Sequence, residues 1–365
     1  MFLEIHFEDA IKLFRRCDQN LKPSPSGRNI YSQIYLLPDF EIKEKINVDG
    51  YTIHPTKKVK LSSLTAGYVA KVDFPDWTLQ HPNPDYCQAC CAYSLSAITS
   101  LVTERCVKYC WLQFALEDSL QEAAVRHPIQ WGATGGIDRI QLDTVDFRDR
   151  LNDTLEIVFS LDSESYINIM RCCGMYQHSM SVRHSDHSLA HALMVSSIES
   201  IATKAVAIQD IKPDWETIRK RCYEAARDAH LEGEFLDLLP TKLEQHYSTA
   251  RFAEFVQTYA PFDSLSLPGR FAGAGLTNET VERIEQMTDP LNKNIHENRD
   301  NPALSDAIKY PKLVKNTYQY RSKLYHAGES GPLRGIDSSE RYVKDILTPI
   351  PFPKICKNDF KGLVQ

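Results

Sequence analysis

The sequence predicts an α+β protein of two domains: a mixed domain of helices and strands over residues 1–160 and an all-helical domain over residues 161–365. Three observations support this prediction. A chain of 365 residues is long enough to form two separate cores. Runs of β-branched and aromatic residues, which are typical of strands, occur up to Leu161 and hardly at all after it. Beyond that point, apolar residues recur at helical spacings.

In the N-terminal domain, β-branched and aromatic residues predict strands at 29–37, 66–74 and 154–161. A helix is predicted from Cys90 to about Val125, because this segment has helical length and is rich in strong helix formers such as leucine and alanine. The uncharged run 86–103 is typical of a buried helix. These elements leave the topology of the domain open.

In the C-terminal domain, the first helix is predicted to begin near residue 162. Asp162 and Ser163 can cap a helix, and Glu164 lies in the first turn, where the helix dipole favours an acidic side chain. Helical spacing of apolar residues, together with helix-forming composition, predicts further helices at 187–206, 214–231, 249–259, 278–287 and 303–326. The second domain is therefore expected to be all-helical.

Composition and charge narrow the class of protein. The formal net charge of −6 argues against indiscriminate binding to nucleic acid, so any nucleic-acid site has to be a local basic patch. Residues 1–16 bring in Glu4, Glu8 and Asp9 early and do not have the layout of a secretory signal. The run 86–103 is too rich in Gln, Ser and Thr to span a membrane. We therefore expect a cytoplasmic protein with reduced cysteines and no membrane partner.

Three other groups of residues could form sites. Five cysteines could supply zinc thiolates, but cysteines in an uncharged helix-like stretch are more often small buried hydrophobes; they are Cys87, Cys90, Cys91, Cys106 and Cys110. His187 and His191 stand one helical turn apart, without the glutamate of a zinc-protease motif. The glycine-rich segment 132–136 is not followed by the Lys-Ser/Thr of a phosphate loop. No metal and no cofactor are expected.

The segment YQYRSKLYHAGE, residues 318–329, is the strongest candidate site. Pro311 can open a helix in which four residues recur at helical spacing and are expected to face the core; they are Leu313, Thr317, Tyr320 and Leu324. At roughly 100° per residue, Arg321 lies on the flank of this stripe and His326 roughly 140° further round. The arc between them is expected to face solvent and holds Tyr318, Ser322 and Tyr325.

A single straight helix would keep the side chains of Arg321 and His326 apart, and two arrangements can bring them together. Gly328 is placed to end the helix, so the backbone at His326 can depart from ideal geometry. Alternatively, two copies of the helix can face each other across a two-fold axis and form a composite site with both arginines and both histidines. The second arrangement predicts a homodimer.

The charge of the same helix indicates a nucleic-acid ligand. Between Ala307 and Gly328 there is no Asp or Glu, which makes this segment a basic patch in an acidic protein; its cations are Lys309, Lys312, Lys315, Arg321 and Lys323. Tyr318 and Tyr325 could stack on unpaired bases. The alternative is a solvated cationic helix end, which needs no ligand.

The residues YQYRSKLYHAGE resemble the signature of the HEPN superfamily, and most closely its Apea-like group, whose last long helix carries Tyr, then Arg-Ser-Lys, an apolar pair and His-Gly. The segment 160–202 is similar to the first two helices of that group, and RFAEFVQTYAP, residues 251–261, to its middle. The resemblance covers roughly residues 160–330. It implies a helical bundle that dimerises through the motif helices, with metal-independent RNA cleavage in many members.

Carried over to this chain, the resemblance implies that Arg321 binds the scissile phosphate and that His326 is the general acid or base. Ser322 would orient the substrate or the histidine. Lys315, Lys323 and the two tyrosines of the motif would contact RNA. Glu199 is either a neighbour of the active site or a solvated helix residue. The chain ends in one short helix and proline-broken sequence, so the closing helix of the bundle is expected to be missing or replaced.

The resemblance further implies an endoribonuclease in a toxin or phage-defence role. The N-terminal domain would then sense a trigger or recruit RNA, and a partner protein could regulate the activity. The alternative is a non-catalytic HEPN module that binds nucleotide, nucleic acid or a partner protein through the same dimer face, since some members of the superfamily have lost activity.

Overall fold

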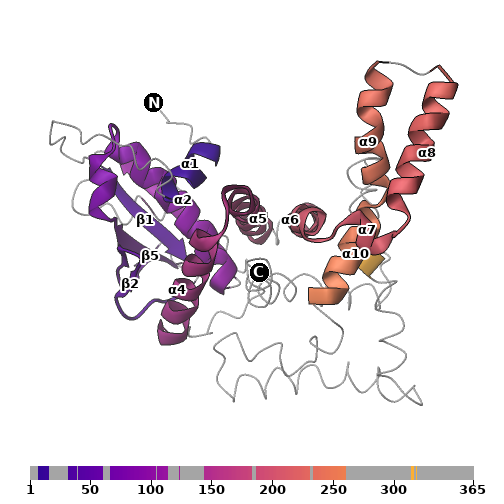
Figure 1. Cartoon of the computed structure of the whole chain (residues 1–365). Coiled ribbons are helices and arrows are strands. Elements are labelled where there is room, and N and C mark those ends of the chain that lie inside the picture. Colours follow the sequence, from indigo (N-terminus) through magenta and orange to yellow (C-terminus); the bar gives the residue numbers. More distant parts are fainter. Residues whose placement is uncertain are drawn as a thin grey trace, which may run out of the picture. The chain divides into compact units, whose positions relative to one another are not determined.

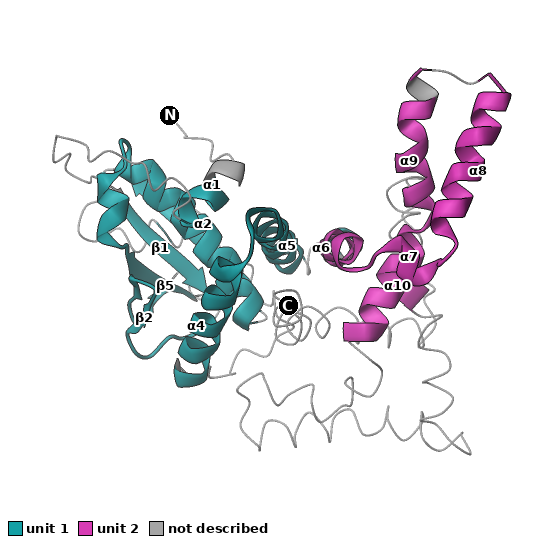
Figure 2. Ribbon diagram, in the orientation of Figure 1, with its two compact units in different colours: residues 1–194, 267–287, 364 teal, residues 195–266, 288–363, 365 magenta. Residues whose placement is uncertain are grey.

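The structure of the chain is a computed structural model, and its elements are shown in Figure 1. It describes residues 7–15, 32–38, 40–60, 66–103, 105–113, 123, 144–182, 186–230, 233–259, 314–315 and 318. These residues form two compact units, coloured separately in Figure 2. The first unit extends to Met194 and the second begins at Val195. By their contacts, residues 163–182, assigned to the helical domain by the sequence, belong to the first unit.

The first unit combines helices with one antiparallel sheet, as the sequence predicts for an α+β protein. Its elements are α1 (Phe7–Phe14), β1 (Ser32–Pro38), β2 (Ile46–Val48), β3 (Tyr51–Ile53), β4 (Lys57–Lys60), β5 (Ala66–Asp73), a 3-10 helix (Asp76–Gln80), α2 (Pro84–Thr103), β6 (Val107–Gln113), α4 (Thr144–Ser160) and α5 (Ser163–Val182). The strand order is β2-β3-β5-β1-β6, and β4 also pairs with β5. The strands predicted at 29–37 and 66–74 are confirmed as β1 and β5.

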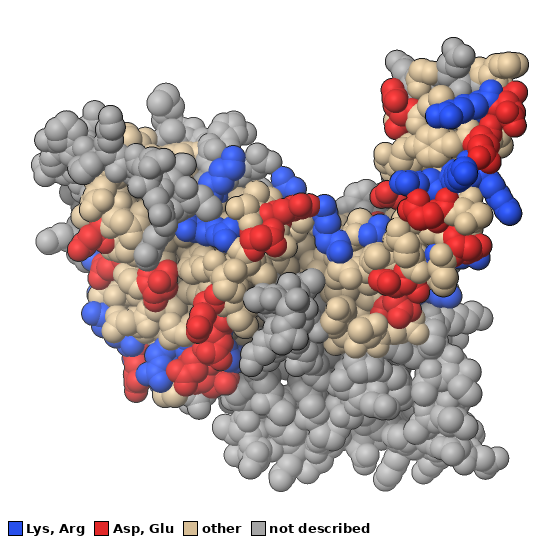
Figure 3. Space-filling model, viewed as in Figure 1, with Lys and Arg blue, Asp and Glu red and all other residues tan. Residues whose placement is uncertain are grey.

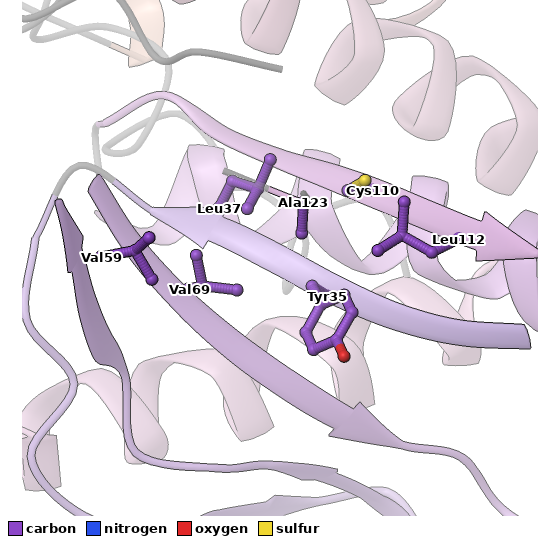
Figure 4. Packing of buried hydrophobic residues seen from close by; sticks show 7 residues of the cluster. All are labelled: Tyr35, Leu37, Val59, Val69, Cys110, Leu112 and Ala123. Carbon is purple, nitrogen blue, oxygen red and sulfur yellow. The ribbon is translucent and has the colours of Figure 1, made fainter. Parts of the chain in front are cut away.

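Successive residues of a strand point to opposite faces of the sheet. In this sheet, buried apolar side chains lie on both faces. Tyr35 pairs with Cys110, and both lie in a buried cluster on one face (Figure 4); the other members are Leu37, Val59, Val69, Leu112 and Ala123. Ile34 lies on the opposite face and packs against Ala89 and Ala92 of α2. One face of the sheet is therefore covered by α2, and the other carries a buried apolar cluster that includes Ala123.

Helix α2 is buried along almost its whole length, as predicted for the run 86–103. Most of its Ser and Thr hydroxyl groups are satisfied without water, because they donate hydrogen bonds to carbonyl oxygens one turn earlier. Thr99 bonds to Leu95 at 2.7 Å and Ser100 to Ser96 at 2.8 Å. The prediction that one helix continues to residue 125 is wrong: α2 ends at Thr103 and the chain turns into β6. The Val, Tyr and Trp of β6 suit a strand better than the leucine that favoured a helix.

The strand predicted at 154–161 is also wrong, because residues 154–160 belong to helix α4. The β-branched residues of this segment suggested a strand, but the apolar spacing over a longer window is helical. Phe147, Leu151, Leu155 and Val158 are all buried and follow one another at three- or four-residue intervals. Burying this stripe outweighs the weak preference of Ile157 and Val158 for extended backbone.

Helix α5 begins where the sequence predicts. The carboxylate of Asp162 accepts hydrogen bonds from the backbone N–H groups of Glu164 and Ser165, at 2.9 and 3.0 Å. Hydrogen bonds from the side chain and backbone of Ser165 hold the pKa of Asp162 below its usual value. Further along, the amide of Gln177 is buried and donates to Ser96 Oγ at 2.8 Å and to the carbonyl oxygen of Val107. This amide joins α5 to α2 and β6.

Gln177→Leu is expected to lower the free energy of unfolding of the first unit by about 1–3 kcal/mol, because buried polar groups on α2 and β6 lose a hydrogen-bond donor. Chemical denaturation followed by circular dichroism measures the change. Gln209→Leu is the matched control, since Gln209 is exposed and its substitution should change stability by less than about 0.5 kcal/mol. Equal effects of the two substitutions would contradict the structural role of Gln177.

The second unit is helical throughout its described residues. Its elements are the C-terminal part of α6 (His187–Ala205), α7 (Ile208–Ile211), α8 (Trp215–Asp228), α9 (Glu234–His246) and α10 (Ser248–Tyr259). The helices predicted at 187–206, 214–231 and 249–259 are confirmed. Helix α9 was missed, because Pro240 inside it is typical of a helix break. The helix predicted at 278–287 lies outside the described residues, and of 303–326 only 314, 315 and 318 are described, all helical.

Candidate functional site

The described part of the candidate site consists of residues from three helical segments of the second unit. Glu199 comes from α6, Arg251 and Phe252 come from α10, and Tyr318 comes from the motif segment. Of the residues that the sequence singled out, the structure brings together Glu199 and Tyr318. Arg321, Ser322, Lys323, Tyr325 and His326 lie outside the described residues.

Tyr318 is buried, with 7% of its surface exposed. Its ring lies against the ring of Phe252, with centroids 5.2 Å apart and planes inclined by 45°. Its hydroxyl donates a hydrogen bond to Oε1 of Glu199. A tyrosine in this setting buries an apolar ring and still provides its hydroxyl with an acceptor. Tyr318 therefore connects the motif segment to both α6 and α10.

The expectation that Tyr318 faces solvent is wrong, and Val314 explains why. Val314 is fully buried and stands four residues before Tyr318, so the two side chains share one helix face. The sequence stripe beginning at Leu313 and Thr317 is centred about 100° away from that face. Lys315, which follows Val314, is exposed. The buried face of this segment is thus rotated by about one residue from the predicted one.

Glu199 is placed by the packing of α6. Ala190, Met194, Ile198 and Ala202 recur at intervals of four and are buried, which fixes the rotation of the helix. Glu199 follows Ile198 and is half-buried at the margin of this face. Glu199 accepts a hydrogen bond from Tyr318, 119 residues away along the chain. It is therefore more than a solvated helix residue, the alternative that the sequence left open.

Arg251 is a buried cation that the sequence did not single out. Its Nε donates to the carbonyl oxygen of Val206 at 2.8 Å, just after α6 ends. Burial lowers the pKa of the guanidinium, and the Glu244 carboxylate partly offsets that effect; an arginine remains charged at neutral pH all the same. Arg251 holds the start of α10 against the end of α6 and so supports the position of Phe252 beside it.

The five cysteines that could serve as zinc ligands are all buried thiols, as predicted for small hydrophobes. Burial, together with the neighbouring Cys87, raises the pKa of the Cys91 thiol, which keeps it protonated at neutral pH. Within the described ranges, no three His, Cys, Asp or Glu side chains come together as metal ligands would. In the same ranges, no helix has both the length and the apolarity needed to cross a bilayer. The side chains of His187 and His191 and the segment 132–136 are not described.

Comparisons with known proteins find no match: no protein-family model matches the chain, and neither a curated protein nor a solved structure resembles it significantly. Membership of the HEPN superfamily therefore stays a prediction from the motif residues.

Proposed function

We propose that the chain is a HEPN-like, metal-independent endoribonuclease that cleaves RNA at a composite site formed by two copies, in a toxin or antiviral-defence role. The observation that carries the proposal is the hydrogen bond from Tyr318 to Glu199. It joins the motif segment to the helix carrying the only acidic residue that the resemblance placed near the active site.

Helical spacing extends this contact toward the motif residues. Residues three and four positions apart lie on the same face of a helix. In a helix that continues past Tyr318, Arg321 and Ser322 would stand on the Glu199 side, one turn further on. A carboxylate at that point can orient a guanidinium, because the two groups form paired, charge-assisted hydrogen bonds. Glu199 is thus assigned the role of positioning Arg321.

Each remaining residue has a role that suits its chemistry. Arg321 neutralises the scissile phosphate with its planar set of donors. His326 acts as general acid or base, since imidazole titrates near neutral pH. The 2′-hydroxyl gives up its proton and attacks the phosphorus, while the P–O5′ bond breaks and the 5′-oxygen takes up a proton. Ser322 orients the substrate or the histidine, and Lys315, Lys323 and Tyr325 contact RNA.

The structure changes the role of Tyr318 in this proposal. The ring of Tyr318 packs against Phe252 and is buried, so it is assigned to holding the motif segment rather than to stacking on a base. Lys315, in contrast, is exposed, so RNA can reach its side chain. An exposed lysine suits a contact with the phosphate backbone.

RNA cleavage by the purified chain in excess EDTA tests the proposal. We expect products ending in a 2′,3′-cyclic phosphate and a 5′-hydroxyl, and no cleavage of DNA of the same sequence, because DNA has no 2′-hydroxyl. Cleavage that requires a divalent metal, or that also degrades DNA, would contradict the mechanism. Binding of RNA or nucleotide without cleavage by a confirmed dimer would favour the non-catalytic module instead.

A further inference from the structure

Helices α8 and α9 form a hairpin within the second unit (Figure 1). They are antiparallel and lie close together in the sequence. At their base the ring of Trp215 packs against that of Tyr247, with centroids 5.3 Å apart. Apolar residues recur at three- or four-residue intervals on both helices and form what we call the apolar seam. The seam consists of Trp215, Ile218, Cys222 and Ala226 of α8 and of Leu236, Leu239 and Leu243 of α9.

Most of the apolar seam stays partly exposed. Among the described side chains of α8 and α9, only Trp215 and Ala226 are buried, although both helices carry apolar residues along their length. Leu238, beside the seam on α9, is 55% exposed. Two helices alone cannot enclose such a stripe, whereas four helices around a common core can. The hairpin thus has the surface of half a four-helix bundle.

The charges of the hairpin indicate what covers it. Helix α8 has four cationic and three anionic side chains, while α9 has one and three. Figure 3 shows basic and acidic side chains interspersed on this part of the molecule. Two of the cations have intrahelical partners, Arg219 with Glu216 at 2.9 Å and Lys220 with Glu224 at 3.9 Å. The small net positive charge of α8 and the net negative charge of α9 are complementary when an identical hairpin is turned through a two-fold axis.

We propose that the α8–α9 hairpin is a dimerisation surface whose partner is the same hairpin of a second copy of this chain. In the resulting antiparallel four-helix bundle, each α8 lies against the α9 of the other copy. The apolar seams of the two copies then face each other, and α8 with its net positive charge lies against the net negative α9 twice. This interface rests on the described residues of α8 and α9 and is independent of whether the chain cleaves RNA.

Cys222 provides a local readout of this interface. It is partly exposed in the apolar seam, whereas the other seven cysteines described are buried. We expect sedimentation equilibrium to show the mass doubling from 41.7 kDa as the protein concentration rises. The rate of Cys222 alkylation by iodoacetamide, followed by mass spectrometry of its peptide, should fall at least about tenfold over the same concentrations, because dimerisation covers the thiol.

Leu239→Ala keeps the helix propensity of α9 but truncates the apolar seam, and it should weaken the dimer at least about tenfold. Thr241→Ala, on an exposed position of the same helix, is the matched control and should leave the dimer unchanged. A dimer in which Cys222 reacts as fast as in the monomer would place the interface elsewhere and overturn the proposal. So would a monomer at all concentrations, whether its Cys222 is reactive or is protected by another part of the same chain.

Discussion

Alanine at Arg321 or at His326 is expected to lower the rate constant of RNA cleavage by about 10²–10⁴-fold. Removing a general acid or base costs about that factor, and removing a donor that stabilises charge in the transition state costs about 10²–10³. The double variant should be little slower than the slower single variant, because the two residues act on one transition state. Single-turnover cleavage of an end-labelled RNA in EDTA measures all three rate constants.

Arg321→Lys and Lys323→Ala separate the proposed roles of charge and geometry. Lysine keeps the charge at position 321 but lacks the planar pair of donors, so cleavage should recover only in part. Lys323→Ala removes a cation from the same segment and should weaken RNA binding and its salt dependence, with little effect on the rate at saturating RNA. If Lys323→Ala reduced the saturated rate as much as Arg321→Ala, a specific role for Arg321 would be excluded.

The helices and strands of the first unit could be predicted from sequence where a segment shows only a helical or only a strand pattern. Strand β1 and the buried part of helix α2 were found because each has a single dominant pattern, whereas the predicted helix ran on past the end of α2 into β6. Helix α4 was missed because a window of eight residues, 154–161, contained Ile157, Val158 and Phe159, which favour strands. The buried positions Phe147 and Leu151 lie outside that window. A longer window reveals the helical stripe.

The sequence predicts which residue types make up the candidate site, but not which face of the motif segment is buried. The spacing of Arg321 and His326 and the lack of acidic residues around them are local properties of the sequence. The contact between Tyr318 and Glu199 joins positions 119 residues apart, and no local pattern specifies such a pair. Val314 and Leu313 are both apolar, so spacing alone chose the wrong face, and the burial of Val314 resolves the choice.

Phe252→Ala is expected to lower the opening free energy of the second unit by about 3–5 kcal/mol, because it removes a ring that is 2% exposed and leaves a cavity. The lost ring is also the one that packs against Tyr318. Hydrogen exchange resolves the effect along the chain. Amides of residues 195–205 and 248–259 should exchange faster, while those of α4 keep their protection. Phe147→Ala, a fully buried phenylalanine of the first unit, should give the opposite pattern.

Tyr318→Phe then separates the ring of Tyr318 from its hydroxyl. The variant keeps the packing against Phe252 but removes the donor to Glu199, so the loss in stability should be about 1–3 kcal/mol and smaller than that of Phe252→Ala. If Tyr318 holds Glu199 where it positions Arg321, cleavage at saturating RNA should fall in Tyr318→Phe. It should fall at least as far in Glu199→Gln, which keeps an acceptor for the hydroxyl but loses the charge that pairs with the guanidinium. A Tyr318→Phe protein that is as stable and as active as the wild type would contradict this role of the hydroxyl. The ring at position 318 would then be sufficient for both stability and cleavage.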